Sequence, residues 1–499
     1  RYPLAVPLEV DKVRIATPVC LQHVCGQLLS DLRTPMNTAA STVVSPDTLV
    51  RKLRQADAEC DRCTVIHVIG EERLELISTL LDIWPLERIL YYRASEVTPA
   101  LNWRMLMRSR ESFQARPNSP AGPQPHPVTV VSEWTRMAPD PAHLGETANR
   151  LAKLTSSDAL TVLATTNTAL IDRILSDEPA RSGDNLVLRL RAPSYREAAQ
   201  EWAGVTPREK ILAYAGFGCS RAMRQLLDTT QPPTTNIISQ ALPRFGRIRS
   251  FIESELLRHS ELRNVGDYRS LLAILGARHR TVDDIRRYDG KASRQQIARR
   301  LHVLVELGRV TRARSIDARG TAPFWYSITD PAWRFHYGFV QPRISDLDVY
   351  APDEVWRRRN TRQWERFMTR SLHALLLEAL EEGVAHLSPV DSGQVHFYRG
   401  AGPGNRHRKL PLVAEKLGGG MVTGNALWNR EPMSRMHLRN HLALLRRLAY
   451  EGKRWAQRAL ERPSEIIFLA AGGFTRRARR EAVRIRPRVT LLQPDDLYF

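Results

Sequence analysis

The fold is decided by the stretch Tyr326-Ser-Ile-Thr-Asp-Pro-Ala-Trp-Arg-Phe-His-Tyr-Gly-Phe-Val-Gln-Pro342. Its apolar and aromatic residues predict a strand that leads into a short, almost wholly buried helix. Pro342 is expected to end that helix, because proline cannot continue the hydrogen-bond ladder. The large side chains of the stretch are Ile328, Trp333, Phe335, Tyr337, Phe339 and Val340. By physical chemistry alone, this is protein core rather than a catalytic site.

Helical patterns and a hairpin precede this stretch. The last helix, within Ser293–Gly308, has Ile297, Leu301, Leu304 and Leu307 on one face and glycine at its end. Two strands follow, 310–314 and 324–328, joined by a turn at Arg319-Gly320. Three helices followed by a β-hairpin predict a winged helix, a module whose third helix enters the major groove of DNA.

The other face of the same helix is basic and polar. Arg and Gln side chains can read base edges, and Arg and Lys bind phosphates. The predicted DNA contacts in this part of the chain are Lys291, Arg294, Gln295, Arg299, Arg300, Arg312, Arg314 and Arg319. The alternative is that the winged helix only packs against neighbouring domains.

The chain of 499 residues is long enough for about three domains, and its net charge is +21. Such an excess points to polyanionic partners, with double-stranded DNA as the leading candidate. Most of this charge is arginine, so a GC-rich genome is an alternative explanation. No apolar stretch is long enough to span a bilayer and the start does not resemble a secretion signal. We therefore expect a cytoplasmic protein without a membrane partner.

Five cysteines, an odd number, fit a reducing compartment. Four of them form the pairs Cys20/Cys25 and Cys60/Cys63, with His23 and His67 nearby. These pairs are a weak zinc candidate, because the gap between them is longer than in ordinary zinc ribbons. Buried or idle thiols are the simpler interpretation.

The apolar run Cys63–Gly70, followed by a helical pattern, opens a P-loop-like domain after an N-terminal extension over residues 1–60. A working P-loop needs glycines, a Lys for the phosphates and a Ser or Thr for Mg²⁺. Here Gly70 is followed by two glutamates and Arg73. The two carboxylates would repel a triphosphate, and a lone arginine at a helix start is usually a surface charge.

The order of these pieces resembles the archaeal-type ATPases of the STAND/AAA+ group. In that family a P-loop domain and a winged helix precede a "Y-x-I-x-D-P-x-x-R-F-W-Y-x-F-V-x-P" segment and a nuclease-like C-terminal domain. The resemblance implies that Ser132 replaces the Asp of the second NTPase signature, that Glu133 is the residue that would activate water, and that Asn167 is the sensor. Without the Lys and the Asp, Mg²⁺ has no protein anchor. Glu133 is then interpreted as a surface carboxylate at a strand end.

The segment Lys409–Trp428 is similar to the core of PD-(D/E)XK nucleases, which uses Asp and Glu to hold Mg²⁺ and Lys to stabilise charge. By this resemblance, Pro411, Asn425 and Leu427 occupy the three catalytic positions. The lone Glu415 does not replace them. The sequence therefore predicts a nuclease-like domain without catalytic residues and without a bound metal.

The C-terminal segment 435–488 carries fifteen Arg or Lys against four Glu. A helix is predicted from Met436 to Leu460, with a basic outer face, and a second one follows a strand at 465–471. A solvated surface explains part of this charge. The predicted DNA contacts here are Arg446, Arg447, Lys453, Arg454, Arg476 and Arg477.

The sequence thus predicts an α/β protein with a degenerate P-loop NTPase domain and helical lid over residues 61–240. A winged helix over 241–342 and a nuclease-like domain over 343–499 follow. We expect a DNA-binding pseudo-ATPase or scaffold that uses neither ATP nor Mg²⁺, with a protein partner or a second copy as a possible assembly. Two alternatives remain open: an ATPase with a non-standard or partner-completed site in a regulatory or defence complex, and a protein-interaction subunit without DNA binding.

Overall fold

The computed structural model describes residues 42–44, 46–59, 64–70, 80, 83, 89–94, 98–114, 128–139, 141–155, 160–165, 186–190, 193–257, 264–318, 320, 322–359, 361–384, 387, 390–401 and 407–498. By its contacts the chain divides into two units, one over residues 1–193 and the other over most of residues 194–499. Residues 194–240, which the sequence analysis placed with the P-loop-like domain, lie in the second unit. Each unit is described by itself.

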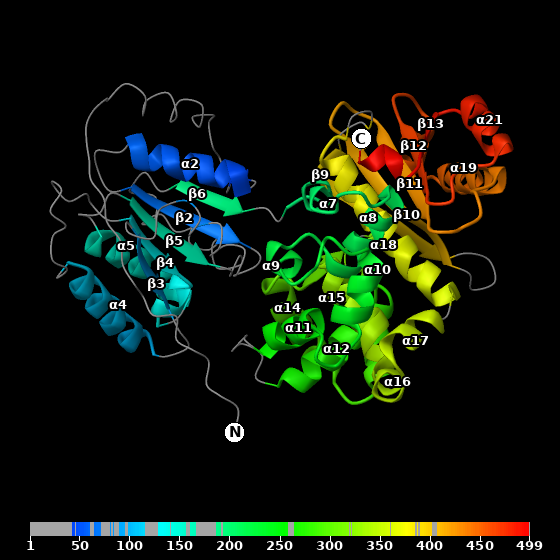
Figure 1. Cartoon of the computed structure of the whole chain (residues 1–499). Helices are drawn as coiled ribbons and strands as arrows, with labels where there is room; N and C mark the ends of the chain where they lie inside the picture. The colour runs from blue at the N-terminus through cyan, green and yellow to red at the C-terminus, as the bar shows by residue number, and fades with distance from the viewer. Residues whose placement is uncertain are drawn as a thin grey trace. The chain divides into compact units, whose positions relative to one another are not determined.

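The described strands of the first unit form one parallel sheet with the order β1-β6-β2-β5-β4-β3 (Figure 1). Its strands are β1 (Thr42–Val44), β2 (Thr64–Gly70), β3 (Ile89–Arg93), β4 (Val128–Ser132), β5 (Leu160–Thr165) and β6 (Leu186–Leu190). Every residue of β4 and β5 is buried, as expected for a parallel sheet that is covered on both faces. The predicted α/β class is confirmed, and the structure adds that the sheet of this unit is parallel.

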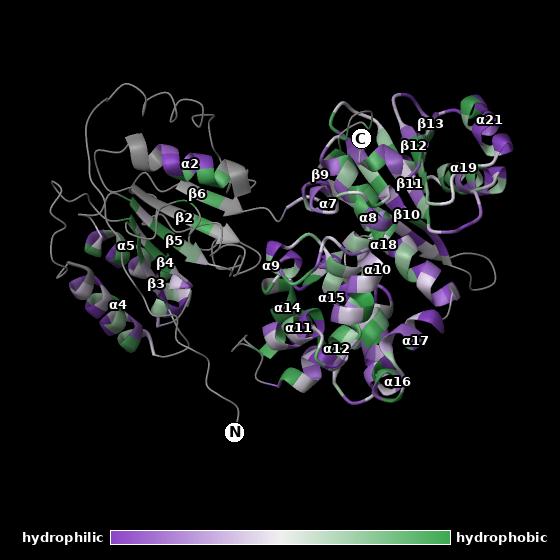
Figure 2. Cartoon of the chain, in the orientation of Figure 1, coloured by the Kyte–Doolittle hydropathy of each residue, from purple (hydrophilic) through white to green (hydrophobic). Residues whose placement is uncertain are grey.

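Helices cover both faces of this sheet. Val130 of β4 packs in a core with α2 (Pro46–Glu59), whereas the adjacent Val131 packs in a second core with α4 (Pro99–Gln114) and α5 (Leu144–Leu154). Successive strand residues point to opposite faces, so one apolar run supplies both cores. In Figure 2 the described residues of β4 and β5 are mainly green, and purple residues gather on the helices.

The second unit begins with a series of helices. They are α7 (Tyr195–Gln200), α8 (Pro207–Phe217), α9 (Arg221–Arg224), α10 (Pro233–Asn236), η5 (Ile237–Ala241), α11 (Arg247–Leu257), α12 (Val265–Ala277), α13 (Val282–Asp289) and α14 (Arg294–Glu306). A hairpin of β7 (Val310–Ala313) and β8 (Trp325–Ile328) follows α14, and the bridge between Arg280 and Tyr326 extends it. Helix α14 ends before Gly308, whose φ is 66°.

The aromatic stretch lies in the core of this unit. Asp330 caps α15 (Pro331–Phe335), because its carboxylate accepts a hydrogen bond from the Trp333 N–H at 2.9 Å. The six large side chains named at the outset are each at most 2 % exposed, which confirms the predicted core. The expected end at Pro342 is wrong. Helical turns continue through η6 (His336–Val340), η7 (Gln341–Arg343) and α16 (Ile344–Val349), because Pro342 lies at the start of a turn, where its missing N–H is not needed.

Two glycines bring the backbones of α12 and η6 into contact. A Cβ atom on Gly338 would lie 2.4 Å from the carbonyl oxygen of Gly276, and a Cβ atom on Gly276 would lie 2.4 Å from the carbonyl carbon of Tyr337. No other residue type fits this crossing.

A second sheet, with the order β13-β12-β11-β10-β9, completes the unit (Figure 1). The strands β9 (Val390–Ala401), β10 (His407–Lys416) and β11 (Met421–Leu427) are antiparallel, while β12 (Glu465–Ala470) and β13 (Arg488–Leu492) run parallel to β11. The helices of this part are α17 (Pro352–Arg357), α18 (Thr361–Glu381), α19 (Arg435–Tyr450), α20 (Arg454–Leu460) and α21 (Arg476–Arg484), followed by η9 (Asp495–Leu497).

The end of the second unit is joined to its beginning. The buried hydroxyl of Tyr195 donates a hydrogen bond to the carbonyl of Leu497 at 2.9 Å. The Tyr195 N–H donates to the carboxylate of Glu378 in α18 at 2.9 Å. Helix α7 therefore depends on contacts from two later parts of the chain.

Candidate functional site

The carboxyl ends of β2, β4 and β5 lie side by side, because Ile69 pairs with Thr165 and Ser132 pairs with Ala164. Ligands of parallel α/β sheets bind at such an edge. Gly70 is the last residue of β2. The predicted nucleotide contacts were Gly70, Arg73, Glu133 and Asn167. Of these, Arg73 and Asn167 lie outside the described residues.

Glu133 corrects the sequence interpretation. Instead of a surface carboxylate, it is 4 % exposed and has a left-handed backbone, with φ of 55°. Among the described residues other than glycine, it alone has a positive φ. The neighbouring Ser132 is fully buried, and its hydroxyl has no hydrogen-bond partner in the described part of the chain. A strained, buried carboxylate at the end of β4 is a feature that often accompanies functional sites.

The zinc hypothesis concerns Cys20, Cys25, Cys60 and Cys63, which lie outside the described residues. The fifth cysteine, Cys219, is a buried thiol whose pKa is raised by burial. Within the described ranges, no group of three or more His, Cys, Asp or Glu is arranged to hold a metal. Within the same ranges, no helix is both long and apolar enough to cross a bilayer.

Helix α14 separates an apolar face from a basic one. Ile297, Leu301 and Leu304 are at most 1 % exposed and hold the helix against the core. The predicted contacts Lys291, Arg294, Gln295 and Arg299 are all exposed. Amphipathic spacing thus leaves an exposed row of cationic and amide side chains on one module.

Two arginines of α14 have acidic neighbours. Arg300 forms an ion pair with Asp267 of α12, which ties the helix to its own module. Arg294 Nε lies 3.6 Å from Asp283 Oδ1, and both side chains are largely exposed. Exposed pairs of this kind are weak, so Arg294 remains available to a phosphate, whereas Arg300 has a structural partner.

The loop of the hairpin is docked within the second unit. The Ile316 N–H donates to the carbonyl of Phe397 in β9 at 2.9 Å, and Trp455 Nε1 donates to Asp317 Oδ1 at 2.6 Å. Lys453 Nζ lies 3.0 Å from Asp317 Oδ2. The loop therefore packs against β9 and the start of α20, and Lys453 is engaged in the contact.

The arginines of the hairpin stack on an aromatic ring. Arg312 and Arg314 lie 5.1 Å and 4.0 Å from the ring centroid of Phe324. Arg312 is exposed and Arg314 is half-buried. Arg319 lies outside the described residues.

In the segment predicted to be nuclease-like, Asn425 lies next to a histidine that the sequence analysis did not single out. His373 Nε2 of α18 lies 3.0 Å from Asn425 Oδ1 and accepts a hydrogen bond from the Ala426 N–H at 2.9 Å. Burial lowers the pKa of His373 to about 4, against the opposing effect of the Asn425 contact. Pro411 and Leu427 lie on the adjacent β10 and β11. No sequence signal joins His373 to a residue 52 positions away.

The basic C-terminal helices are shorter than predicted. The expected helix 436–460 is wrong as a single element: α19 ends at Tyr450 and α20 begins at Arg454, with Gly452 at φ of 81° between them. Left-handed backbone breaks the helix there. Four of the predicted DNA contacts in these helices are exposed and have no described acidic partner: Arg446, Arg454, Arg476 and Arg477. Arg447 is exposed and pairs with Glu451 at 3.1 Å.

Comparison of the sequence with protein-family models and with curated proteins finds no match. Among solved structures, the chain is similar to the ORC2 protein of Aeropyrum pernix in its ADPNP–ADP complexes, with 11 % identity and a TM-score of 0.32 over 61 % of this chain and 93 % of that one. The A. pernix ORC1 protein in complex with DNA gives 13 % identity and a TM-score of 0.32 over 60 % and 93 %. Cdc6p from Pyrobaculum aerophilum gives 12 % identity and a TM-score of 0.27 over 64 % and 98 %. Likenesses this low carry no conclusion about function.

Proposed function

We propose that this protein binds double-stranded DNA through the second unit and acts as a scaffold rather than as an enzyme. In this proposal α12–α14 and the β7–β8 hairpin are a winged helix, and the part from α18 to β13 is a nuclease-like domain without a catalytic centre. The observation that carries the proposal is that Arg294, Gln295 and Arg299 are exposed on α14, with the exposed Lys291 just before the helix. The opposite face of α14 is buried through Ile297, Leu301 and Leu304.

The chemistry of this row suits a groove of DNA. Arginine and lysine bind phosphates and fix the position of the module on the duplex. The amide of Gln295 can form two hydrogen bonds with an adenine edge in the major groove. The docked hairpin loop leaves α14 as the main reading element, with the exposed arginines of α19, α20 and α21 adding contacts to the backbone.

The proposed loss of catalysis rests on residue types. The glutamates after Gly70 and the serine at position 132 leave Mg²⁺-nucleotide without its usual ligands. At the nuclease-like centre, an amide and an uncharged imidazole stand where a metal would need carboxylates. We therefore propose that no ATP, Mg²⁺ or nuclease activity is required for DNA binding.

The DNA proposal is tested by titrating a labelled duplex with the full chain over a salt series. We expect binding that weakens steeply with salt. The double variant Arg294→Ala/Arg299→Ala should reduce the slope of log K against log salt by about 2, because two phosphate contacts are lost. Gln295→Ala should instead reduce discrimination between duplexes by about 1–3 kcal/mol.

The matched control is Arg362→Ala, which removes an exposed arginine from α18 of the same unit. An equal loss of binding in the control would show that binding depends on the total positive charge and not on the arginines of α14. Absence of binding in the wild-type protein would favour a protein-interaction subunit whose charge reflects codon usage.

A second candidate function, ATP hydrolysis at a non-standard site, is favoured by one observation. Glu133 is buried and strained at the carboxyl edge of the sheet, where a water-activating carboxylate would lie in a P-loop domain. We expect no protection by ATP and Mg²⁺ in a thermal unfolding assay. A rise in the unfolding temperature, together with hydrolysis that Glu133→Gln abolishes, would establish the ATPase instead.

A further inference from the structure

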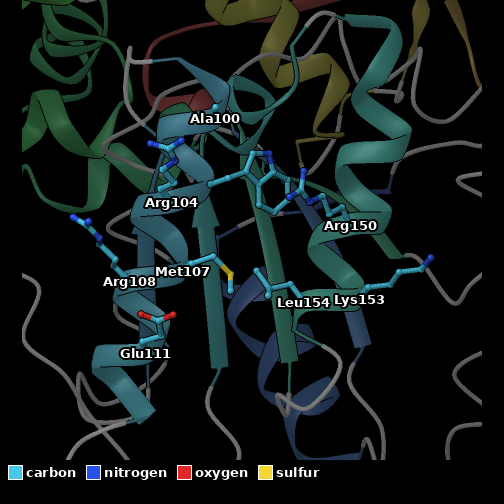
Figure 3. Close-up of a pocket in the computed structure, with 9 residues that line it drawn as sticks. Ala100, Arg104, Met107, Arg108, Glu111, Arg150, Lys153 and Leu154 are labelled. Atoms are coloured by element: carbon cyan, nitrogen blue, oxygen red, sulfur yellow. The ribbon is translucent and has the colours of Figure 1, made fainter.

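A groove in the first unit lies outside every site described so far. It has a volume of about 830 Å³ and runs between α4 and α5, on the sheet face that carries the core of Val131 and Leu163 (Figure 3). Its α4 residues extend from Ala100 to Glu111, which corresponds to about 17 Å along the helix axis. That length equals about three turns of a second helix.

The middle of the groove is apolar. Figure 3 shows Met107 and Leu154 pointing towards each other from the two helices. Trp103 and Leu154 are partly buried and pack against the core of this sheet face. Met107 is 40 % exposed. An adaptable surface of methionine and leucine is typical of sites that receive apolar side chains.

Cations border this apolar strip on both sides. Arg104 and Arg108 lie on α4, and Arg150 and Lys153 lie on α5; all four are exposed (Figure 3). The single carboxylate among the lining residues is Glu111, at the C-terminal end of the α4 segment. The groove is therefore an apolar strip between two positive borders, with one negative end.

We propose that this groove binds an amphipathic helix of a partner protein that carries acidic residues on both sides of an apolar ridge. The ridge would fill the strip of Met107 and Leu154, and the flanking carboxylates would face the two cationic borders. Charge complementarity selects this occupant, because a basic or neutral helix would leave the four cations without acidic partners. Glu111 disfavours a carboxylate over the last turn of the groove.

The same cations would attract single-stranded nucleic acid, but the apolar strip favours a helix. Nucleic-acid grooves bind bases by stacking on free aromatic faces. Trp103 is the one aromatic residue among those that line the groove, and the guanidinium of Arg150 lies over its ring, 4.2 Å from the centroid. Met107 and Leu154 offer no flat face to a base.

The test uses the full chain and a capped, fluorescent twelve-residue peptide with leucines at helical spacing, flanked by glutamates. A second peptide has alanine in place of each leucine and the same charge. We expect the leucine peptide to bind and the alanine peptide to bind about tenfold more weakly. The variant Arg104→Glu/Arg108→Glu should weaken the leucine peptide about tenfold, because both side chains are exposed and their reversal leaves the fold intact.

Arg51→Glu is the matched control, since Arg51 is an exposed arginine on α2 of the same unit. An unchanged affinity in this control supports the groove; equal weakening would overturn the proposal. Failure of the leucine peptide to bind would also overturn it. Oligothymidylate could also displace the leucine peptide from the wild-type protein. If the variant Arg104→Glu/Arg108→Glu no longer bound oligothymidylate, the groove would be assigned to single-stranded nucleic acid instead. None of these outcomes depends on DNA binding by α14.

Discussion

Replacing Gly338 by alanine is expected to destabilise the second unit by about 3 kcal/mol, a large part of the stability of an ordinary domain. The new Cβ atom would lie 2.4 Å from the carbonyl oxygen of Gly276. The carbonyl oxygen belongs to the backbone of one helix, and the new Cβ would be fixed to the backbone of the other. Neither atom can therefore move aside as the tip of a side chain could. The two elements would have to separate, which opens the core around Trp333 and Phe339.

The measurement is urea unfolding of the full chain, followed by near-ultraviolet circular dichroism, which reports on the packed aromatic residues. The matched control is Gly266→Ala in the same helix α12, where an added Cβ has no atom within 4 Å. Alanine is the better helix former by about 1 kcal/mol, so the control should be at least as stable as the wild type. Equal stability of Gly338→Ala and the wild type would contradict the close crossing.

Acid is expected to unfold the second unit through histidines that are buried without charge. Burial lowers the pKa of His441 to about 4 and that of His336 to about 3, with Arg249 and Arg269 adding to the effect at His336. Both values lie below the ordinary value of about 6.5, so the unfolded chain takes up protons first. The stability that comes from keeping His441 uncharged is fully present above pH 6.5 and is lost as the pH falls towards 4. For His441 the loss is on the order of 3 kcal/mol.

The variant His441→Gln should remove part of this acid dependence. His441 Nε2 lies 3.0 Å from the Thr423 hydroxyl, and its Nδ1 has no partner in the described part of the chain, so a charged ring would leave a buried N–H unpaired. The readout is the slope of unfolding free energy against pH, which separates titration from a general loss of stability. His302→Gln on the exposed side of α14 is the control. An unchanged slope in His441→Gln would contradict the prediction.

The elements that could be predicted from sequence are those whose pattern is local. Apolar runs identified β2 and β12, because a buried strand needs little besides such a run. The face of α14 with Ile297 and Leu301 followed from helical spacing. The predicted helix 436–460 failed at Gly452, where the apolar pattern continues although the backbone turns. The helix end predicted at Pro342 was wrong for a related reason: proline is tolerated in the first turn of a helix as well as just after the last one.

The site was less predictable because its properties depend on distant contacts. Exposure of Arg294 and Arg299 could be inferred from one helix, but the engagement of Lys453 required Asp317, far earlier in the chain. The burial of Glu133 depends on how the end of β4 is enclosed, and no property of a lone glutamate indicates a left-handed backbone. The groove between α4 and α5 likewise exists only once both helices lie on the sheet.

The hydrogen bond from Tyr195 to Leu497 joins residues 302 positions apart. A ribosome releases the chain from its first residues onward, so α7 emerges long before α18 and η9, which complete its surroundings. The second unit should therefore finish folding only after residue 497 has left the exit tunnel. Contacts this remote also slow folding, since the long loop must close before they stabilise anything.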